Sequence, residues 1–370
     1  MTKRPLRLGF IGGGLGSIAG NTHYAAATMD GLYRLHTGAF STHPLTNQET
    51  ADLWHIDPSY DSWMTMIDKE TQNIDACVIL TPTPTHAPIV KELLKRKIPI
   101  ICEKAFVASL AEADELKALY NPSEHFMQVT YNYTGYPLIR ELRERILNDE
   151  LGEIINIRLE MPQESFLRPP VSQKYPQAWR LKDDYIPTIC LDLGVHIQHM
   201  ASFLTGMDPI RVMGKMDTFS HYGVVDNVDV FMEYPSGATG QLWMSKTALG
   251  HRNGLAVHIY GTKASAHWIQ TQPEQLQLHY SNGEKKIVER GGDTLLCGQK
   301  RYNRMTPGHP AGFIEAFANL YVDIAEDFQN FQNNTKIKNP YTFGIEEAHK
   351  GLHLFHKVKE SHDTRQWVDL

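Results

Sequence analysis

The feature that most constrains this chain is a glycine-rich turn directly after a short apolar run near its start. The apolar run is Leu6–Ile11, the turn reads GGGLGS over residues 12–17, and the alanine-rich stretch Ser17–Met29 favours a helix. Strand, glycine turn and helix in this order hold a diphosphate, because glycines let the backbone approach phosphate oxygens and a helix N-terminus presents free N–H groups. Gly12 and Gly14 match the dinucleotide-binding fingerprint, and the third position is Ser17. Alone, the turn also fits a purely structural role.

Length and composition narrow the class of protein. The chain has 370 residues, a net charge of −6 and 42% hydrophobic residues. This length suggests two domains, and the charge gives no support for binding to nucleic acid or to an anionic membrane. We find no signal-peptide pattern and no apolar run of membrane-spanning length, so a soluble cytoplasmic protein is expected. The four cysteines are far apart in the sequence, which predicts buried free thiols.

The first part of the chain alternates strand-like and helix-like segments. This alternation predicts a doubly wound parallel sheet, an α/β Rossmann domain over residues 1–132. Ligands of such sheets bind beyond the carboxyl ends of the strands, so function is expected in the loops that follow them. The expected strands are Leu6–Ile11, Leu35–Ser41, Asp75–Leu80, Ile98–Cys102 and Phe126–Thr130.

Three of these loops carry candidate residues. After the second strand no acid occurs between Gly31 and Gln48, so the ribose pocket near Ser41 leaves NAD and NADP both open. After the third strand comes TPTPTH, residues 81–86, whose His86 is either a solvent-facing first-turn residue or part of a nicotinamide wall. After the fourth comes Glu103-Lys104, either a surface ion pair or a functional pair.

The second part, residues 133–370, predicts an α+β domain with a large, mostly antiparallel open sheet. The expected helix Leu138–Asn148 carries the alternating charges RELRER over residues 140–145, which is most simply a solvated face. A C-terminal helix with apolar residues at helical spacing is expected to supply core packing, and it could pack back on the first domain. The expected strands are Ile154–Met161, Ile210–Asp217, Val228–Tyr234, Thr239–Ser245, Leu255–Tyr260 and Ala264–Ile269.

The strongest chemical candidate in this part is DLGVHIQH, residues 192–199. If Thr188–Leu204 is one helix, Asp192, His196 and His199 share a face. A histidine that titrates near neutral pH suits proton transfer in alcohol oxidation, and a nearby carboxylate can bind a hydroxyl. Hydrogen-bonded histidines in a packing seam, or a two-histidine, one-carboxylate metal site, are the alternatives.

Taken together, the glycine turn, TPTPTH, CEKA and LDLGVH resemble the glucose-fructose oxidoreductase/inositol dehydrogenase (Gfo/Idh/MocA) family. In that family the lysine of EKP lies between nicotinamide and substrate, which carries over to Lys104; the family's proline is Ala105 here. The resemblance implies NAD or NADP as cofactor, a sugar or cyclitol as substrate, and homodimers or homotetramers built through the outer face of the C-terminal sheet. The GGG start and the late Gly308-His309-Pro310 segment resemble levoglucosan-type and related glycoside-oxidising members.

These observations predict an NAD(P)-dependent dehydrogenase that acts on a secondary hydroxyl. Three alternatives stay open: a glycoside-cleaving enzyme that retains its cofactor, a metal-dependent enzyme, and a non-catalytic dinucleotide sensor. The expected catalytic residues are Lys104, His196 and Asp192, with no metal in the primary hypothesis. The expected cofactor-binding residues are Gly12, Gly14, Leu15, Gly16, Ser41, Thr81, Pro82, His86, Glu103, Lys104 and Asn132. The expected substrate-binding residues are Lys104, Tyr133, Arg180, Asp192, His196 and His309.

Overall fold

The chain forms two compact units. The computed structural model describes residues 4–168, 175–292, 294–335 and 339–370. The first unit comprises Met1–Gly135 and Phe313–Ala348, and the second comprises Tyr136–Gly312 and His349–Leu370. The predicted division at residue 132 lies close to the first change of unit, but the segment from Phe313 returns to the first unit.

The first unit is built on a five-stranded sheet of order β2-β1-β3-β4-β5, in which all neighbouring pairs are parallel. This confirms the predicted doubly wound sheet. Its order reverses between β1 and β3, so the ends of these two strands form the switch point where ligands of such sheets bind. The strands are β1 (Leu6–Gly12), β2 (Tyr33–Ala39), β3 (Ala76–Leu80), β4 (Ile100–Glu103) and β5 (Met127–Thr130).

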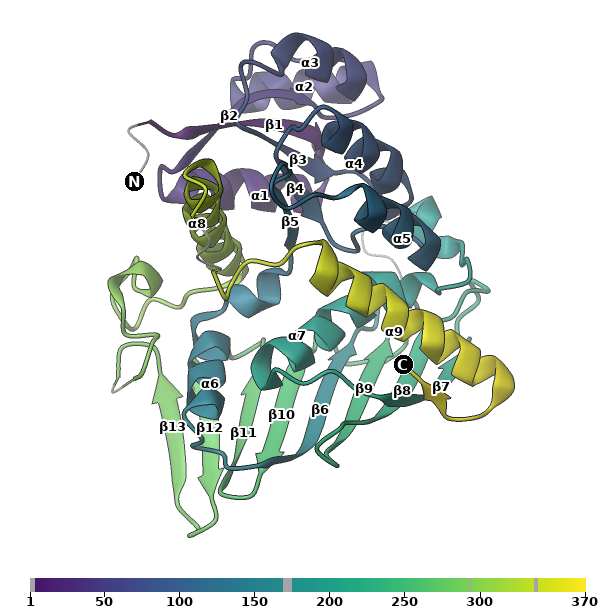
Figure 1. Cartoon of the computed structure of the whole chain (residues 1–370), viewed down its shortest axis with the longest axis vertical. Coiled ribbons are helices and arrows are strands. Elements are labelled where there is room, and N and C mark those ends of the chain that lie inside the picture. The colour runs from purple at the N-terminus through teal and green to yellow at the C-terminus, as the bar shows by residue number, and fades with distance from the viewer. Residues whose placement is uncertain (1–3, 169–174, 293, 336–338) are drawn as a thin grey trace. The chain divides into compact units, whose positions relative to one another are not determined.

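Helices and one late segment complete this unit. The helices are α1 (Ile18–Met29), α2 (Pro44–Trp54), α3 (Trp63–Glu70), α4 (His86–Lys95), α5 (Leu110–Leu119) and α8 (Phe313–Gln332), with short 3₁₀ turns η1 (Thr83–Thr85) and η2 (Asn132–Gly135). Helix α8 lies beside α1 (Figure 1). Its residues Phe317, Leu320 and Ile324 join Leu8 and Phe10 in one buried core, which explains why α8 belongs here.

The second unit contains a nine-stranded sheet of order β13-β12-β11-β10-β6-β9-β8-β7-β14. Every described pair is antiparallel except β6 with β9, which is parallel. The predicted open, mostly antiparallel sheet is confirmed. The strands are β6 (Ile154–Pro162), β7 (Arg211–Asp217), β8 (Asn227–Glu233), β9 (Thr239–Ser245), β10 (Ala256–Gly261), β11 (Ala264–Ile269), β12 (Gln275–Tyr280), β13 (Lys285–Glu289) and β14 (Val368–Asp369).

Strands β12, β13 and β14 were not expected from the sequence. The first two carry alternating patterns, QLQLHY and KKIVE, and a turn with Asn282-Gly283 joins them. Asparagine followed by glycine between alternating runs is a strong hairpin signal, and Gly283 indeed has a positive φ of 89°. The hairpin was therefore readable in principle. The two-residue strand β14 is too short to leave such a pattern.

One face of this sheet is covered by helices α6 (Pro137–Leu147), α7 (Val195–Thr205) and most of α9 (Ile345–Thr364) (Figure 1). Close packing requires small residues there: a Cβ on Gly214 of β7 would lie 2.6 Å from a Val358 methyl of α9. The other face carries half-exposed side chains, because successive residues of a strand point to opposite faces. Short 3₁₀ turns η4 (Ala178–Leu181) and η6 (Lys300–Tyr302) lie outside the sheet.

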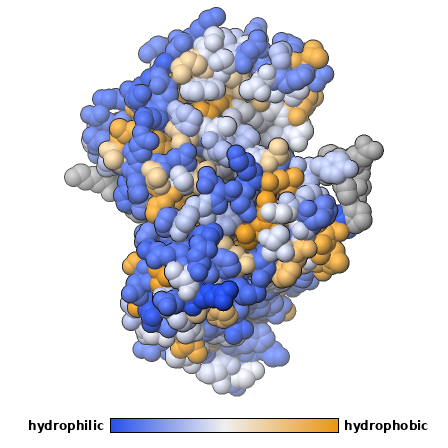
Figure 2. Space-filling model, turned by 90° about the vertical axis from the view of Figure 1, so that its right-hand side faces the viewer, coloured by the Kyte–Doolittle hydropathy of each residue, from blue (hydrophilic) through white to orange (hydrophobic). Residues whose placement is uncertain are grey.

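No helix in the described ranges is long and apolar enough to cross a membrane. Figure 2 shows one face of the molecule, on which hydrophobic residues lie in scattered groups among hydrophilic ones. All four cysteines are buried and free, as predicted.

The expected helix over Thr188–Leu204 is present, but it is not regular in its first turns. Residues Cys190–Gly194 form a π-helix, η5, and the regular helix α7 begins only at Val195. The N–H of Val195 donates to the carbonyl of Cys190, five residues back. This wider turn changes the spacing on which the shared face of Asp192 and His196 was predicted.

The charged run of α6 is not a solvated face, contrary to expectation. Arg140 and Glu141 are 0% exposed and Arg145 is 4% exposed. The Glu141 carboxylate accepts backbone N–H groups of Leu295, Leu296 and Cys297 at 2.7–3.1 Å, and Arg145 donates to it at 2.8 and 3.0 Å. Burial alone would raise the pKa of Glu141, but these N–H donors and Arg145 lower it below its usual value.

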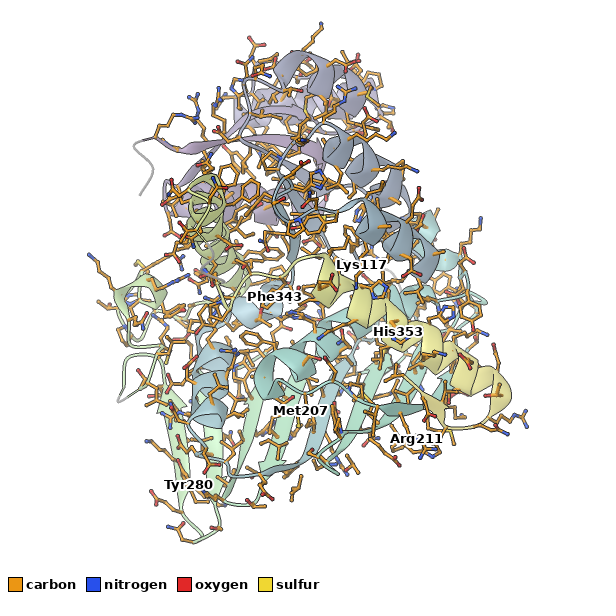
Figure 3. The ribbon with its side chains drawn as sticks, in the orientation of Figure 1. Lys117, Met207, Arg211, Tyr280, Phe343 and His353 are labelled. Atoms are coloured by element: carbon orange, nitrogen blue, oxygen red, sulfur yellow. The ribbon has the colours of Figure 1, made fainter. Side chains whose placement is uncertain are left out.

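The same network extends to the sheet. Arg145 also binds Glu150 at 2.8 and 2.9 Å, and Glu150 accepts the hydroxyl of Tyr280, which lies at the end of β12 (Figure 3). The charged run was expected to be solvated. Glu141 can instead be buried because the loop over residues 295–297 supplies the N–H donors that its carboxylate needs.

We predict that Glu141→Gln lowers the free energy of unfolding by about 3 kcal/mol, because it leaves buried donors and Arg145 without their charged acceptor. Chemical denaturation measures this loss. Since the folded pKa of Glu141 is lowered, its contribution is present above the unfolded pKa and is lost as the pH falls through the folded value. The difference between wild type and variant should therefore shrink in acid. Glu144→Gln, on the half-exposed side of the same helix, should change stability by less than about 1 kcal/mol.

Candidate functional site

The glycine turn of the first unit forms a cradle that admits no side chains at its centre. Gly12 and Gly13 have φ of 83° and 79°, and added Cβ atoms would lie 2.8 Å from the Thr81 methyl and 2.7 Å from a Leu80 methyl. Gly20 of α1 packs directly against the turn, and a Cβ added to Gly20 would lie 1.7 Å from the Gly13 carbonyl oxygen. This close approach of helix to strand is the task of the third fingerprint glycine, and here Gly20 performs it.

The predicted third position, Ser17, has a different role. Its hydroxyl accepts the N–H of Gly20 at 3.1 Å and caps α1. The turn is held against the rest of the unit by two further bonds. Gly14 N–H donates to the Phe40 carbonyl at 3.0 Å, and Leu15 N–H donates to the Thr50 hydroxyl at 2.9 Å. Gly16 has a φ of 86°, and a Cβ on it would meet no atom within 4 Å.

The end of β2 carries Ser41, whose hydroxyl accepts the N–H of His43 at 3.0 Å just before α2 begins. Nearby, the side chain of Asn47 accepts the N–H of Phe40 at 2.8 Å. Both side chains therefore stabilise the turn after β2. The lack of an acid between Gly31 and Gln48 leaves the choice between NAD and NADP as open as it was from the sequence.

His86 does not face solvent, and its expected place beside the nicotinamide stays a prediction. It is 0% exposed, so it is not a solvent-facing residue. Its Nε2 lies 2.7 Å from the Thr81 carbonyl, and its Nδ1 lies 3.0 and 3.1 Å from the carbonyls of Ala105 and Phe106. Burial lowers the pKa of His86, although the carbonyls act in the opposite direction. The ring joins the loops after β3 and β4 and so fixes the backbone around Thr81 and Pro82 on one side and Lys104 on the other.

Glu103 lies at the centre of a buried hydrogen-bonded chain. His23 Nε2 lies 2.9 Å from a Glu103 carboxylate oxygen that also accepts the Thr130 hydroxyl, and His23 Nδ1 lies 2.8 Å from the Tyr321 hydroxyl. A neutral ring satisfies both contacts by donating to Glu103 and accepting from Tyr321. Burial raises the pKa of Glu103, but His23, Lys104 and Thr130 outweigh it and lower the pKa overall. The Glu103 side chain is only 13% exposed, so it does not lie on an open surface, and a functional role for Glu103-Lys104 stays a prediction.

Lys104 follows Glu103 at the end of β4, and the peptide bond between Lys104 and Ala105 is cis. Two residues of η2 belong to the same unit. Tyr133 is buried with its ring 5.9 Å from that of Phe313. Asn132 is 2% exposed, and among the described residues no hydrogen-bond partner meets its Nδ2 atom.

In the second unit, Asp192 of the π-helix binds two cations. Arg180 donates to its two carboxylate oxygens at 3.2 and 3.0 Å, and Lys246 donates at 2.7 Å. The Arg180 guanidinium stacks 4.5 Å from the Trp179 ring. Arg180 was expected to bind substrate, and the structure shows it bound to Asp192. Lys246 was not identified from the sequence.

His196 and His199 lie in the first half of α7 and are 5% and 4% exposed. Burial lowers the pKa of His199 to about 3, so this ring stays neutral at neutral pH.

His309 is exposed and lies in the loop before α8. Because α8 begins only at Phe313, His309 does not cap this helix. The His309 carbonyl accepts a hydrogen bond from buried Arg290 at 2.9 Å, which holds this loop.

A metal site is not supported. In the part of the chain that the structure describes, no group of three His, Cys, Asp or Glu side chains could hold a metal ion. The alternative built on Asp192, His196 and His199 therefore has no ligand set there.

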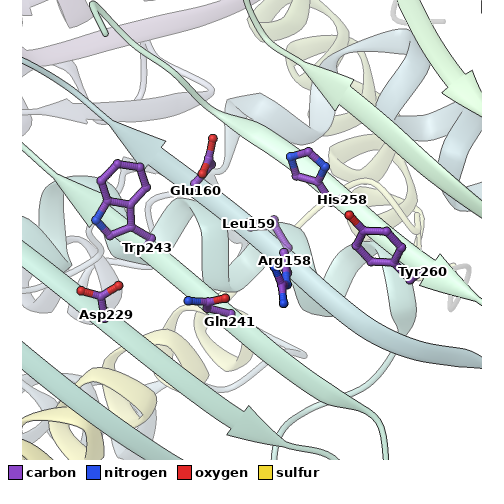
Figure 4. A pocket seen from close by; sticks show the side chains of 8 residues that line it. All are labelled: Arg158, Leu159, Glu160, Asp229, Gln241, Trp243, His258 and Tyr260. Atoms are coloured by element: carbon purple, nitrogen blue, oxygen red, sulfur yellow. The ribbon is translucent and has the colours of Figure 1, made fainter. Parts of the chain in front are cut away.

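A hollow of about 270 Å³ lies on the open face of the nine-stranded sheet, away from the helices (Figure 4). It is lined by Arg158, Leu159, Glu160, Asp229, Gln241, Trp243, His258 and Tyr260. Leu242 and Met244, which alternate with two of these residues on β9, are buried on the other face. The hollow is thus separated by the sheet from α7 and its histidines.

Three residues with evident positions were missed in the sequence: Gly20, His23 and Lys246. Gly20 and His23 lie in the helix that follows the glycine turn, just beyond the six residues of the fingerprint. Their position in the first turns of that helix was the available signal. Lys246 had no sequence signal, because it lies far from Asp192 in the chain.

The first unit fits a dinucleotide. Its cradle excludes side chains where a diphosphate must approach, α1 starts at the turn, and the Nδ2 atom of Asn132 offers a donor. The residues that would hold the cofactor are those of the turn and the ends of β2, β3 and β4, the edge at which dinucleotides bind.

Comparison with known proteins agrees with this geometry. Residues 6–131 match the oxidoreductase family with an NAD-binding Rossmann fold, and residues 139–267 match the GFO/IDH/MocA C-terminal domain. The chain is 27% identical to the uncharacterized oxidoreductase YfiI of Bacillus subtilis, over 99% of this chain and 97% of that protein. It is 24% identical to levoglucosan dehydrogenase of Pseudarthrobacter phenanthrenivorans, over 83% and 82% of the two chains.

A solved structure extends the likeness to the whole fold. The chain superposes on an inositol dehydrogenase homolog from Azotobacter vinelandii, complexed with NADH and myo-inositol, with a TM-score of 0.90 and 27% identity over 100% of this chain and 98% of that one. Both halves are thus matched by sequence and by structure, and the chain belongs to the Gfo/Idh/MocA family of oxidoreductases, with its NAD-binding Rossmann domain.

Proposed function

We propose that this protein is an NAD(P)-dependent dehydrogenase that oxidises a secondary hydroxyl of a sugar, a sugar derivative or a cyclitol. The observation that carries the proposal is the dinucleotide cradle, in a chain that also places Asp192 and His196 four residues apart on one helical segment. The relative complexed with NADH and myo-inositol supports the substrate class.

The proposal assigns a separate role to each group. NAD or NADP supplies a hydride acceptor. As the alcohol carbon loses its hydride, the hydroxyl proton passes to His196 and a ketone forms. Lys104 donates to the reacting oxygen and stabilises its developing negative charge. Asp192 accepts a hydrogen bond from a hydroxyl of the substrate and so orients the ring. Arg180, Tyr133 and His309 remain proposed substrate contacts.

A second candidate is glycoside cleavage through transient oxidation with a retained cofactor. The likeness to levoglucosan dehydrogenase supports only the oxidation with which it would begin. It uses the same residues and differs in its product, because the sugar is reduced again after the glycosidic bond breaks. A pure sensor role is less well supported, since the chain keeps both Lys104 and His196.

We also propose that the open face of the nine-stranded sheet pairs with a second copy of the chain. This face presents both signs of charge, with Arg158 beside Glu160 on β6, and it carries exposed Phe231 on β8. A face with both signs can match itself across a two-fold axis.

The first test is a panel of cyclitols, sugars and glycosides offered with NAD and with NADP, followed by absorbance of reduced nicotinamide and by product analysis. His196→Ala should lower kcat by about 10²–10⁴-fold, because a positioned proton acceptor is lost. Lys104→Ala should lower kcat as well. His199→Gln is the matched control, since a buried neutral ring cannot shuttle protons at neutral pH. Full turnover in folded His196→Ala would contradict the assigned role.

The second prediction concerns the cradle. A Cβ on Gly16 would meet no atom within 4 Å, and Asp and Asn, which adopt positive φ more readily than other side chains, share the same backbone strain. Gly16→Asp should raise the Kd for NADH at least about tenfold relative to Gly16→Asn, because only the charge differs and it lies beside the diphosphate. Fluorescence titration measures both values. Equal affinities would place the diphosphate elsewhere.

The third prediction concerns the second copy. Phe231→Glu should convert the oligomer to a smaller species in light scattering, since it adds an unpaired charge to the covered face. Leu119→Glu changes an exposed apolar residue of α5 in the same way and should leave the mass unaltered. A wild-type monomer, or an unchanged mass in Phe231→Glu, would overturn the assembly proposed here.

A further inference from the structure

Lys246 is a buried lysine to which no role has yet been given. It directly follows β9, and its backbone is held on both sides: its N–H donates to the Asp226 carbonyl at 2.8 Å, and its carbonyl accepts the N–H of Phe166 at 2.9 Å. Its side chain is 4% exposed, and its ammonium lies 5.0 Å from the centre of the Phe166 ring. A lysine this buried normally has a partner of opposite charge.

That partner is Asp192. The Lys246 ammonium donates to Asp192 Oδ2 at 2.7 Å, and the same oxygen accepts Arg180 Nε at 3.2 Å, while Oδ1 accepts Arg180 Nη2 at 3.0 Å. The two cations differ in exposure, because the Arg180 side chain is 31% exposed and that of Lys246 is 4% exposed. Arg180 is therefore partly open to solvent, whereas Lys246 is enclosed by the protein.

Two cations on one carboxylate restrict what that carboxylate can do. Protonating Asp192 would leave a buried ammonium without its counter-charge, which is strongly unfavourable. Asp192 is therefore suited to accept hydrogen bonds as a permanent anion and unsuited to take up a proton. This separates it from His196, whose imidazole is the proposed acceptor of the alcohol proton.

We propose that Lys246 is a positioning residue that holds Asp192 ionised and oriented, so that Asp192 binds a hydroxyl of the substrate while His196 alone moves the proton. The inference rests on the proposed polyol oxidation. The inference adds Lys246 to the residues that the proposed function uses. It gives hydroxyl binding to Asp192 and proton transfer to His196.

The charge of Asp192 is measured without turnover. Carboxyl ¹³C NMR of the full-length protein, labelled at aspartate and assigned by comparison with Asp192→Asn, follows protonation against pH. Removing a cation from a carboxylate favours its neutral form. In Lys246→Met the Asp192 resonance should therefore titrate at higher pH than in wild type, and in Lys246→Arg it should return toward the wild-type position.

Kinetics with myo-inositol and levoglucosan as probes test the positioning role. Lys246→Met should raise KM at least about tenfold, since a hydrogen bond to a charged, fixed acceptor is weakened. The acid limb of the kcat/KM profile should move to higher pH in Lys246→Met, because Asp192 is then protonated at a higher pH than in wild type. Lys246→Arg should restore most of both properties, whereas a purely structural defect would not be rescued in the pH profile.

Lys350→Met is the matched control, because Lys350 pairs with Asp208 at 2.5 Å on the exposed surface of the same unit. It should leave KM and the pH profile unchanged. If Lys246→Met does not fold, Lys246→Gln, which also removes the charge but keeps a polar end, is measured in its place. An unshifted Asp192 resonance with a wild-type KM would overturn the proposal. If wild type turns over neither probe nor any polyol of the panel, the proposed function fails, while the resonance still decides whether Lys246 holds the charge on Asp192.

Discussion

The first unit depends most on the hydrogen bonds to the Glu103 carboxylate, whose side chain is only 13% exposed. A carboxylate inside a protein needs donors, and Glu103 finds them on β5, through Thr130, and on α1, through His23. His23 in turn reaches the Tyr321 hydroxyl of α8. One charge thus links the last part of the sheet, the helix after the glycine turn and a helix from near the C-terminus. Lys104 is the next residue in the chain, so this network also fixes the start of the segment that carries it.

The second unit repeats the principle with different partners. Glu141 is satisfied by three backbone N–H groups and an arginine, and Asp192 by an arginine and a lysine. The first cluster fixes a loop, and the second fixes a group proposed to touch substrate. In each case the acid is useful because its donors come from distant segments, so that one charge holds several pieces of chain in place. The π-helix at residues 190–194 contributes by displacing Asp192 from the regular spacing of α7.

Much of the fold was predictable. The alternation of apolar and helical segments predicted all five strands of the parallel sheet, because strands buried on both faces are apolar throughout. The strands of the second sheet followed from period-two alternation, and the β12–β13 hairpin was missed although its Asn-Gly turn is visible. The π-helix could not be predicted, since a single inserted residue in a helix leaves no periodic signal. The burial of Arg140, Glu141 and Arg145 could not be predicted either. A run of alternating charges has the same sequence pattern whether its side chains are solvated or are buried with hydrogen-bond partners.

The sequence by itself determined the class of the protein and the residues to consider. The glycine turn, TPTPTH, Glu103-Lys104 and DLGVH are local patterns, and their chemistry depends on residues that are neighbours in the chain. The tertiary structure alone decided what each of these residues binds. His86 joins two loops, Glu103 is held by His23 and Thr130, and Asp192 is held by Lys246, which lies on a strand end far along the chain. The physical reason is that a buried polar group is defined by its partner, and partners are chosen by packing across the fold rather than by sequence spacing.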